Sequence, residues 1–224
     1  MPLLQANDLS KTYSVAGRAI PVLANIGLAV EPAEFLVIQG SSGSGKSTLL
    51  SILSGLDRPD AGQVLFDGHD LCVMDEDALA PLRNRWFGFV FQAFHLVPSL
   101  TVRENVMFPA ELNRDRQARS KAETLLNRVG LGDRLDSFPE QLSGGEMQRC
   151  AICRALVNGP RILFADEPTG SLDSTNGRMV LDLLLELRQE RQSALVLVTH
   201  SEVIASRADR VVLLADGRLA PHVP

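Results

Sequence analysis

The part of the chain that says most about its fold reads Gly40-Ser41-Ser42-Gly43-Ser44-Gly45-Lys46-Ser47. This stretch fits the pattern G-x-x-x-x-G-K-[ST], and it lies between an expected strand, 35–39, and an expected helix that begins at Lys46. Glycine lets the backbone curl so that successive N–H groups face one point, and the start of the helix adds a positive dipole there. The pattern therefore predicts a loop that cradles the phosphates of a nucleotide.

The side chains at the end of this loop have separate expected roles. Lys46 brings a full positive charge toward the β- and γ-phosphates, and the Ser47 hydroxyl is an expected ligand of Mg²⁺. We expect Thr48, the next residue of the helix, to belong to the nucleotide-binding residues as well. A flexible Gly/Ser turn is the alternative, but such a turn needs neither a lysine nor the start of a helix.

Apolar periodicity and turn signals divide the chain into strands and helices. Expected strands cover 3–9, 24–30, 35–39, 63–66, 87–91, 162–165 and 195–198, with a hairpin at 210–219. Expected helices cover 46–53, 75–85, 103–112, 115–129, 145–157, 174–190 and 202–208. Strand–helix alternation favours parallel pairing with helices on both faces of the sheet. The fold class is therefore α/β, with a strand-rich first third and an inserted, mostly helical stretch.

Composition narrows the classes of protein to which the chain can belong. A net charge of −5 argues against a broad electrostatic grip on nucleic acid or on an anionic membrane surface. No apolar stretch approaches the ~20 residues that a membrane-spanning helix needs, and the first ten residues do not resemble a signal peptide. Cys150 and Cys153 form a C-x-x-C, but an apolar helical pattern surrounds them, so we expect packing groups and not a redox or zinc site.

A second candidate site follows the expected strand 162–165, which is apolar and ends directly before Asp166 and Glu167. At the carboxyl end of a parallel strand, such side chains emerge where open α/β sheets bind their ligands. Asp166 is then expected to hold Mg²⁺ through a water molecule. Glu167 is expected to act as the general base that polarises the attacking water. The alternative for a single acid is a helix cap or a solvated strand end.

The segment Leu142-Ser143-Gly144-Gly145-Glu146 resembles the signature of the ABC ATPases. The resemblance implies a P-loop NTPase of the ABC type, with a mostly parallel core sheet, an antiparallel β subdomain and an inserted helical subdomain. It also implies that two copies of the chain enclose two ATP molecules. In that arrangement Ser143, Gly144 and Gly145 of one subunit contact the γ-phosphate that the other subunit holds.

Further positions resemble the family along nearly the whole chain. Tyr13 is similar to the aromatic residue that stacks on adenine, and Gln92 to the glutamine that contacts Mg²⁺ and links the nucleotide site to the permease. His200 resembles the histidine that touches the γ-phosphate, so Lys46, Glu167 and His200 are the expected catalytic residues. Residues 171–173 are similar to a loop that communicates across the dimer.

The resemblance also implies how a single ABC ATPase domain, 1–224, is organised. Residues 1–91 and 159–224 are expected to form the nucleotide-binding core with the β subdomain. About 92–158 is expected to form the helical subdomain that carries the signature. Ala33, Ser171 and Ser201 stand where the family often has glycine, asparagine and aspartate, but none of these departures removes a catalytic group.

The segments 88–92, 96–98 and 101–106 are similar to the lipoprotein-release and macrolide-exporter branch of the family. This implies an ATPase subunit that drives a separate integral membrane permease from the cytoplasmic face of the inner membrane, with no nucleic-acid partner. The alternatives are a soluble ABC ATPase of DNA repair and a cell-division regulator. The 50 residues from Gln92 to Leu142 leave room only for a compact lobe, which argues against the DNA-repair class. The apolar residues after Gln92 are the expected permease contact, with burial in the core of the lobe as the alternative; they are Phe94, Leu96, Val97, Pro98 and Leu100. The transported substrate stays open.

Overall fold

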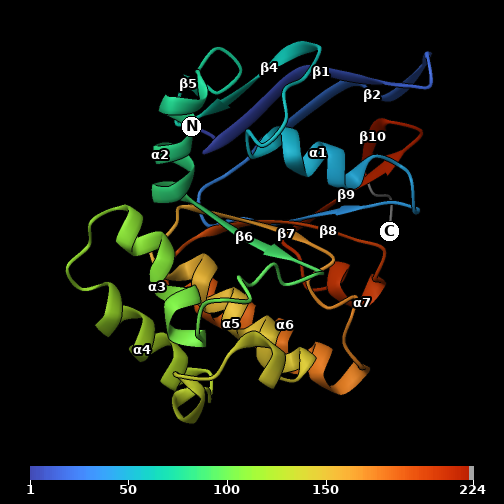
Figure 1. Cartoon of the computed structure of the whole chain (residues 1–224). Helices are drawn as coiled ribbons and strands as arrows, with labels where there is room; N and C mark the ends of the chain where they lie inside the picture. The colour runs from blue at the N-terminus through green and yellow to red at the C-terminus, as the bar shows by residue number, and fades with distance from the viewer. Residues whose placement is uncertain (222–224) are drawn as a thin grey trace. The chain divides into compact units, whose positions relative to one another are not determined.

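The computed structural model describes residues 1–221 (Figure 1). These residues form two compact units. The first unit contains Met1–Ala80 together with the chain from Ala194 onward, and the second contains Pro81–Ser193. The second unit contains residues 87–91, 162–166 and the helix 174–190 in addition to the predicted helical subdomain, about 92–158, whose bounds remain a prediction.

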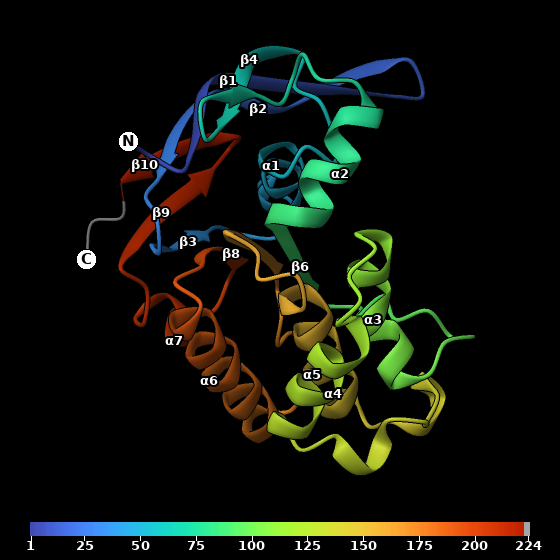
Figure 2. The ribbon, with the colours of Figure 1, turned by 90° about the vertical axis from the view of Figure 1, so that its left-hand side faces the viewer.

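Four strands of the first unit form an antiparallel sheet in the order β2-β1-β4-β5. Their bounds are Leu4–Val15 for β1, Arg18–Val30 for β2, Ala61–Phe66 for β4 and His69–Asp70 for β5. One face of this sheet is apolar and fully buried, at Leu9, Ile26 and Val64. Helix α1, Lys46–Leu53, lies beneath β1, β2 and β4 in both views and buries Leu49, Leu50, Ile52 and Leu53 (Figures 1 and 2).

The hairpin of β1 and β2 is longer than the sequence predicts. The predicted strands stop at residue 9 and restart at 24, whereas the structure pairs them as far as Val15 and Arg18. Ala16 and Gly17 form the turn with φ of 49° and 77°, a left-handed pair that suits the right-handed twist of a hairpin. Residues 12–21 are all exposed, so no apolar alternation marks this extension.

The other strands of the first unit supply the parallel pairs. Strand β3, Phe35–Gln39, pairs in parallel with β8, Ala194–Thr199, and on its other side with β9, Arg210–Ala215. Strand β10, Arg218–Pro221, runs antiparallel to β9. Every residue of β8 is buried, which explains why its sequence is apolar up to Thr199. The short helix α7, Glu202–Ala205, follows β8 and ends earlier than predicted.

In the second unit, strand β6, Phe87–Phe91, pairs in parallel with β7, Ile162–Asp166. The helices are α3, Val102–Leu112, α4, Ala118–Arg128, α5, Gly144–Leu156, and α6, Ser174–Glu190, with single turns at Gly132–Arg134 and Pro139–Gln141. Helix α2, Glu76–Trp86, contains the boundary between the units. Helix α4 begins later than predicted, because the Asp115 carboxylate accepts a hydrogen bond from the Gln117 N–H and holds a turn there.

Helix α5 is central to the second unit, where it contacts α3, α4, α6 and β6. Figure 2 shows α5 beside α6, as Figure 1 does. Cys150 and Cys153 are fully buried on α5. Burial raises the pKa of both thiols, that of Cys150 to about 12, so they remain protonated packing groups. Within residues 1–221, no helix is both long enough and apolar enough to span a membrane.

The packing of α5 on β6 depends on Gly88. A Cβ at this position would lie 2.4 Å from the Ala155 carbonyl oxygen and 2.5 Å from Leu163 Cδ2. We predict that Gly88→Ala lowers the free energy of unfolding by about 1–3 kcal/mol, because backbone atoms cannot move aside as a flexible side chain can. Urea denaturation measures the loss.

Gly27→Ala is the matched control for this prediction. Gly27 also lies in a strand, and nothing stands within 4 Å of its added Cβ. We expect a change of no more than about 0.5 kcal/mol there. Equal losses in the two variants would show that the close contact of α5 with β6 does not explain the effect.

Candidate functional site

The loop 40–47 has the curled backbone that its sequence predicts. Gly43 and Gly45 have φ of 79° and 99°, a left-handed conformation that disfavours residues with a side chain. Gly45 is also the N-cap of α1, so the loop runs directly into the positive end of the helix. A Cβ on Gly40 would lie 2.4 Å from the Leu214 carbonyl oxygen. Three of the glycines are therefore required by geometry.

Two polar side chains of this loop, those of Lys46 and Ser44, lie against it. Lys46 Nζ donates to the carbonyl oxygens of Gly40 and Ser41, each at 2.8 Å, so the ammonium group lies over the loop. Ser44 is 8% exposed, and its hydroxyl has no hydrogen-bond partner among the described residues. The loop thus offers backbone N–H groups, one charge and a buried hydroxyl to an anion of phosphate size.

Strand register places His200 at the same edge of the first unit as this loop. Gln39 pairs with Thr199 where β3 and β8 run in parallel. Gly40 and His200 each follow one of these paired residues, and the His200 side chain is exposed. The structure therefore brings His200 and the loop together, as expected of side chains at the carboxyl ends of neighbouring parallel strands.

Tyr13 is held by a polar cluster on the same unit. Its hydroxyl donates to Asp57 Oδ2 at 2.6 Å, and Lys11 Nζ lies 2.9 Å from Asp57 Oδ1 and 5.0 Å from the centre of the Tyr13 ring. Burial and the hydrogen bond with Asp57 raise the pKa of Tyr13, while a hydrogen bond with Thr48 opposes them. The ring is 37% exposed and fixed at its hydroxyl end. Sequence analysis missed Lys11 and Asp57, which lie 46 residues apart.

In the second unit, Gln92 and Glu167 follow a paired position of β6 and β7, because Phe91 pairs with Asp166. Glu167 has φ of 42°, unusual for a residue with a side chain, and its carbonyl accepts the Gly170 N–H at 2.9 Å. The Ser171 hydroxyl donates to the Gln92 carbonyl at 3.1 Å. Three predicted motifs therefore meet at the carboxyl end of these strands.

The signature segment forms the N-terminus of α5 in the same unit. Ser143 is the N-cap, and its backbone N–H donates to Glu146 Oε2 at 2.8 Å. The Ser143 hydroxyl accepts the Glu146 N–H at 3.4 Å and lies 2.7 Å from the same carboxylate oxygen. A Cβ on Gly144 would lie 3.3 Å from Leu172 Cδ2, so the signature packs against the loop that follows Gly170.

The predicted residues are thus distributed over both units. Tyr13, residues 40–48 and His200 belong to the first unit, while Gln92, residues 143–145, Asp166 and Glu167 belong to the second. Across residues 1–221, no three His, Cys, Asp or Glu side chains gather as a metal site would require. Ser47, Gln92 and Asp166 all offer oxygen, the donor atom that Mg²⁺ prefers.

The capping box of α5 predicts a pH dependence of stability. Hydrogen bonds from the Ser143 hydroxyl and N–H lower the pKa of Glu146 from its usual 4.5. The ionised carboxylate therefore stabilises the folded state above pH 4.5, and this contribution is lost as the pH falls through the lowered pKa. We predict that Glu146→Gln is less stable than the parent by about 0.5 kcal/mol at pH 7 and that the difference shrinks as the pH falls below 4.5.

Denaturation at a series of pH values checks this prediction. Glu140→Gln is the matched control, since Glu140 lies in the same unit and is exposed. The free energy of unfolding of the parent and that of Glu140→Gln should have the same dependence on pH. A difference between the parent and Glu146→Gln that grows toward low pH would contradict the assigned sign.

Comparison with known proteins shows which family the chain resembles. Residues 23–170 match the family described as ABC transporter. The chain is 46% identical to the macrolide export ATP-binding/permease protein MacB of Syntrophobacter fumaroxidans over 99% of its own length, but it spans only 32% of that relative. It is 44% identical to the lipoprotein-releasing system ATP-binding protein LolD 2 of Chlorobaculum tepidum, covering 97% of this chain and 91% of the relative.

A solved structure extends the likeness to the whole fold. The ATP-binding cassette MJ0796, in a dimeric post-hydrolysis state bound to ADP and phosphate, superimposes with a TM-score of 0.88 at 37% identity, covering 99% of both chains. This match confirms the predicted fold class, with parallel strands, an antiparallel β sheet and a helical region. By its motifs, its fold and its relatives, this chain belongs to the ABC transporter family.

Proposed function

We propose that this chain is the ATP-binding and ATP-hydrolysing subunit of an ABC transporter of the LolD/MacB type. The observation that carries the proposal is the loop 40–47, whose left-handed glycines and inward Lys46 form a phosphate cradle at the start of α1. The family match and the motifs of the second unit support it. The chain spans about a third of the MacB relatives, so its role within a whole transporter is part of the proposal.

In this proposal the first unit binds the nucleotide. Backbone N–H groups of 40–47 donate to the phosphates, and Lys46 exchanges its two carbonyl acceptors for phosphate oxygens. The Ser44 hydroxyl, which has no partner among the described side and main chains, gains an acceptor there. Thr48 joins this set, and adenine stacks on the Tyr13 ring that Asp57 holds in place.

Hydrolysis is assigned to three side chains. Glu167 takes a proton from the attacking water, whose oxygen bonds to the γ-phosphorus while the bond to the β–γ bridging oxygen breaks, giving ADP and phosphate. His200 orients this water and the γ-phosphate, and Lys46 neutralises charge that develops on the phosphates. Mg²⁺, held by Ser47, Gln92 and, through water, Asp166, would neutralise further charge.

The composite site needs two copies of the chain. MJ0796 is dimeric with ADP and phosphate bound, and we propose the same assembly here, with ATP in place before hydrolysis. Ser143, Gly144 and Gly145 then contact the γ-phosphate held by the other subunit. The N-terminus of α5 suits this task, because its N–H groups and dipole favour an anion.

A groove on the second unit suits the permease. It has a volume of about 270 Å³, and both apolar side chains and charges of both signs line it: Leu100, Arg103, Glu104, Met107, Phe108, Glu111 and Arg119. Phe108 is 45% exposed and Leu112, one turn further along α3, is 61% exposed. We propose that a cytoplasmic helix of an integral membrane permease docks here, so the chain works at the cytoplasmic face of the inner membrane.

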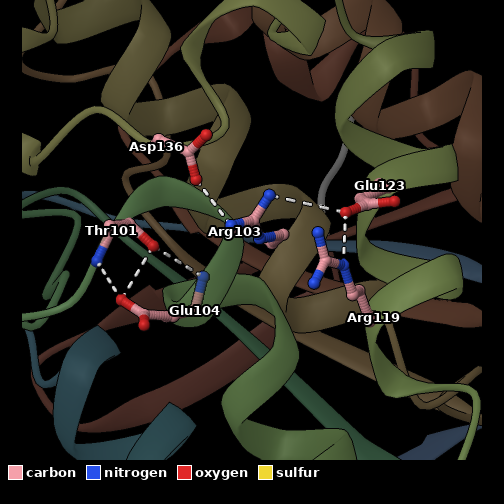
Figure 3. A network of polar contacts seen from close by, with 6 residues as sticks. All are labelled: Thr101, Arg103, Glu104, Arg119, Glu123 and Asp136. Carbon is pink, nitrogen blue, oxygen red and sulfur yellow. Dashed lines mark hydrogen bonds and ion pairs between the residues drawn. The ribbon is translucent and has the colours of Figure 1, made fainter.

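Ion pairs hold the wall of this groove in place (Figure 3). Arg103 lies between Glu123 of α4, at 3.5 Å, and Asp136, at 2.5 Å, while Arg119 Nε is 2.9 Å from the same Glu123. Thr101 caps α3 through a capping box with Glu104. Of the apolar residues predicted as permease contacts, Leu100 lines the groove, whereas Leu96 does not.

We predict that Glu167→Gln binds ATP but does not hydrolyse it, because the amide keeps the shape of the side chain and cannot accept the proton. ATP should then accumulate a stable dimer, which gel filtration with Mg²⁺ and ATP detects. Lys46→Ala is the control: it removes the positive charge that faces the phosphates, so this variant should neither bind ATP nor form the dimer. A turnover rate of Glu167→Gln equal to the parent's would refute the assigned base.

For the groove, we predict that Phe108→Asp abolishes co-purification with a tagged permease subunit while the ATPase rate of the isolated chain stays within about twofold. The substitution removes an apolar contact from the groove and places there a charge that has to be desolvated on docking. Val73→Asp is the matched control, since Val73 is 80% exposed and lies in the first unit. Retained co-purification of Phe108→Asp would exclude this groove from the permease interface.

A further inference from the structure

Gln148 is a buried polar residue in the middle of the second unit. It lies on α5 five residues after Ser143, and none of its surface is exposed. It shares the inward face of the helix with the apolar Ile152 and Ala155. Burying an amide is unfavourable unless its hydrogen bonds are made, so the contacts of this side chain call for an explanation.

The donor half of the amide contacts two backbone carbonyls from different segments. Gln148 Nε2 lies 2.5 Å from the Pro168 carbonyl oxygen and 3.4 Å from the Phe91 carbonyl oxygen. Pro168 directly follows Glu167, and Phe91 directly precedes Gln92. One side chain of the signature helix therefore holds the backbone beside both the proposed base and the proposed Mg²⁺ ligand.

The acceptor half of the same amide is buried without a hydrogen-bond partner in the described part of the chain. Two carbonyl oxygens can be contacted only by the NH₂ group, so the orientation of the amide follows from its neighbours. An unmade hydrogen bond at Oε1 is unfavourable, and a methionine of similar size would avoid it. The contacts at this position are therefore made by the N–H donors of the amide, which reach carbonyl oxygens of two segments.

The segment that Gln148 holds is strained. Glu167 has φ of 42°, a conformation that persists only where the surroundings impose it. The Gly170 N–H, donating to the Glu167 carbonyl at 2.9 Å, and the Gln148 amide, donating one residue further on, are two such restraints. Removing the second frees the turn on which the carboxylate sits.

We propose that Gln148 is a positioning residue, which ties the signature helix to the backbone of Glu167 and Gln92, so that a shift of α5 reorients the hydrolytic carboxylate. When Ser143–Gly145 contact a nucleotide, Gln148 passes the resulting shift of α5 to the Glu167 carboxylate of the same subunit. The inference rests on the proposed ATPase function and adds a route by which binding at the signature reaches the base.

Steady-state kinetics of Gln148→Met test this role. Methionine fills the volume and removes both N–H donors, so kcat should fall roughly tenfold to hundredfold, as a small misplacement of a catalytic group does. The affinity for ATP should stay within about twofold, because the phosphate loop lies in the other unit. Gln189→Met is the matched control, the same change at an exposed position of α6, and it should keep the parent's kcat.

The outcomes separate this inference from the function on which it rests. A parent protein without ATPase activity refutes the proposed function. A parent that hydrolyses ATP beside a Gln148→Met protein with unchanged kcat refutes the positioning role alone. A purely structural role would lower the melting temperature and leave kcat unchanged below it.

A second measurement covers the case in which Gln148→Met does not fold. The side-chain amide protons of Gln148, assigned in Glu167→Gln protein by their proximity to Pro168 and Phe91, should exchange slowly with solvent. Their resonances should shift when ATP forms the dimer, since α5 then moves against the turn. Resonances that ATP leaves unchanged would overturn the coupling.

Discussion

The arrangement of the second unit depends on how closely helix α5 approaches strand β6. At Gly88 the backbone of the strand and the Ala155 carbonyl leave no room even for a methyl group. This approach sets the depth at which α5 lies and brings Gln148 within reach of Phe91 and Pro168. The position of the signature at the start of the same helix follows, because an α-helix behaves as a rigid rod over its few turns.

Unusual backbone conformations occur where the proposed chemistry is. Gly43 and Gly45 take left-handed φ without strain, since they carry no side chain. Glu167 takes a similar φ with a side chain, and its turn is held by hydrogen bonds from Gly170 and, through Pro168, from Gln148. In the phosphate loop, where backbone N–H groups bind the ligand, the left-handed positions are glycines. At Glu167, where the side chain must point in one direction, hydrogen bonds hold a residue with a side chain in the same conformation.

Sequence reasoning recovered the elements whose periodicity is strong. Four elements have the predicted bounds: Phe35–Gln39, Lys46–Leu53, Phe87–Phe91 and Ser174–Glu190. Each is buried on one or both faces, and such burial requires a regular pattern of apolar residues in the sequence. The hairpin extension at residues 12–21 left no such trace, since it is exposed throughout. Backbone pairing and a left-handed turn, not side-chain burial, define that part of the sheet.

Those parts of the candidate site that form a contiguous motif could be predicted from the sequence. Contacts between residues far apart in the chain could not. Residues 40–48 and 143–145 are local patterns, whereas Asp57 meets Tyr13 from 44 positions away. Gln148 could be identified from the sequence, because the helical period places its polar amide on the same apolar face as Ile152 and Ala155. A polar residue that interrupts an apolar helix face is therefore worth testing as a link between motifs.

The N-terminus of α5 combines two opposing electrostatic effects. Its dipole and N–H groups favour an anion, while the Glu146 carboxylate already accepts hydrogen bonds from the Ser143 N–H and hydroxyl and places a negative charge there. A phosphate arriving from a second subunit under the proposed mechanism has to displace this carboxylate from the Ser143 N–H. Ser143 is therefore where binding first changes the hydrogen bonds of α5, and Gln148, five residues along the same helix, lies where that change meets the hydrolytic turn.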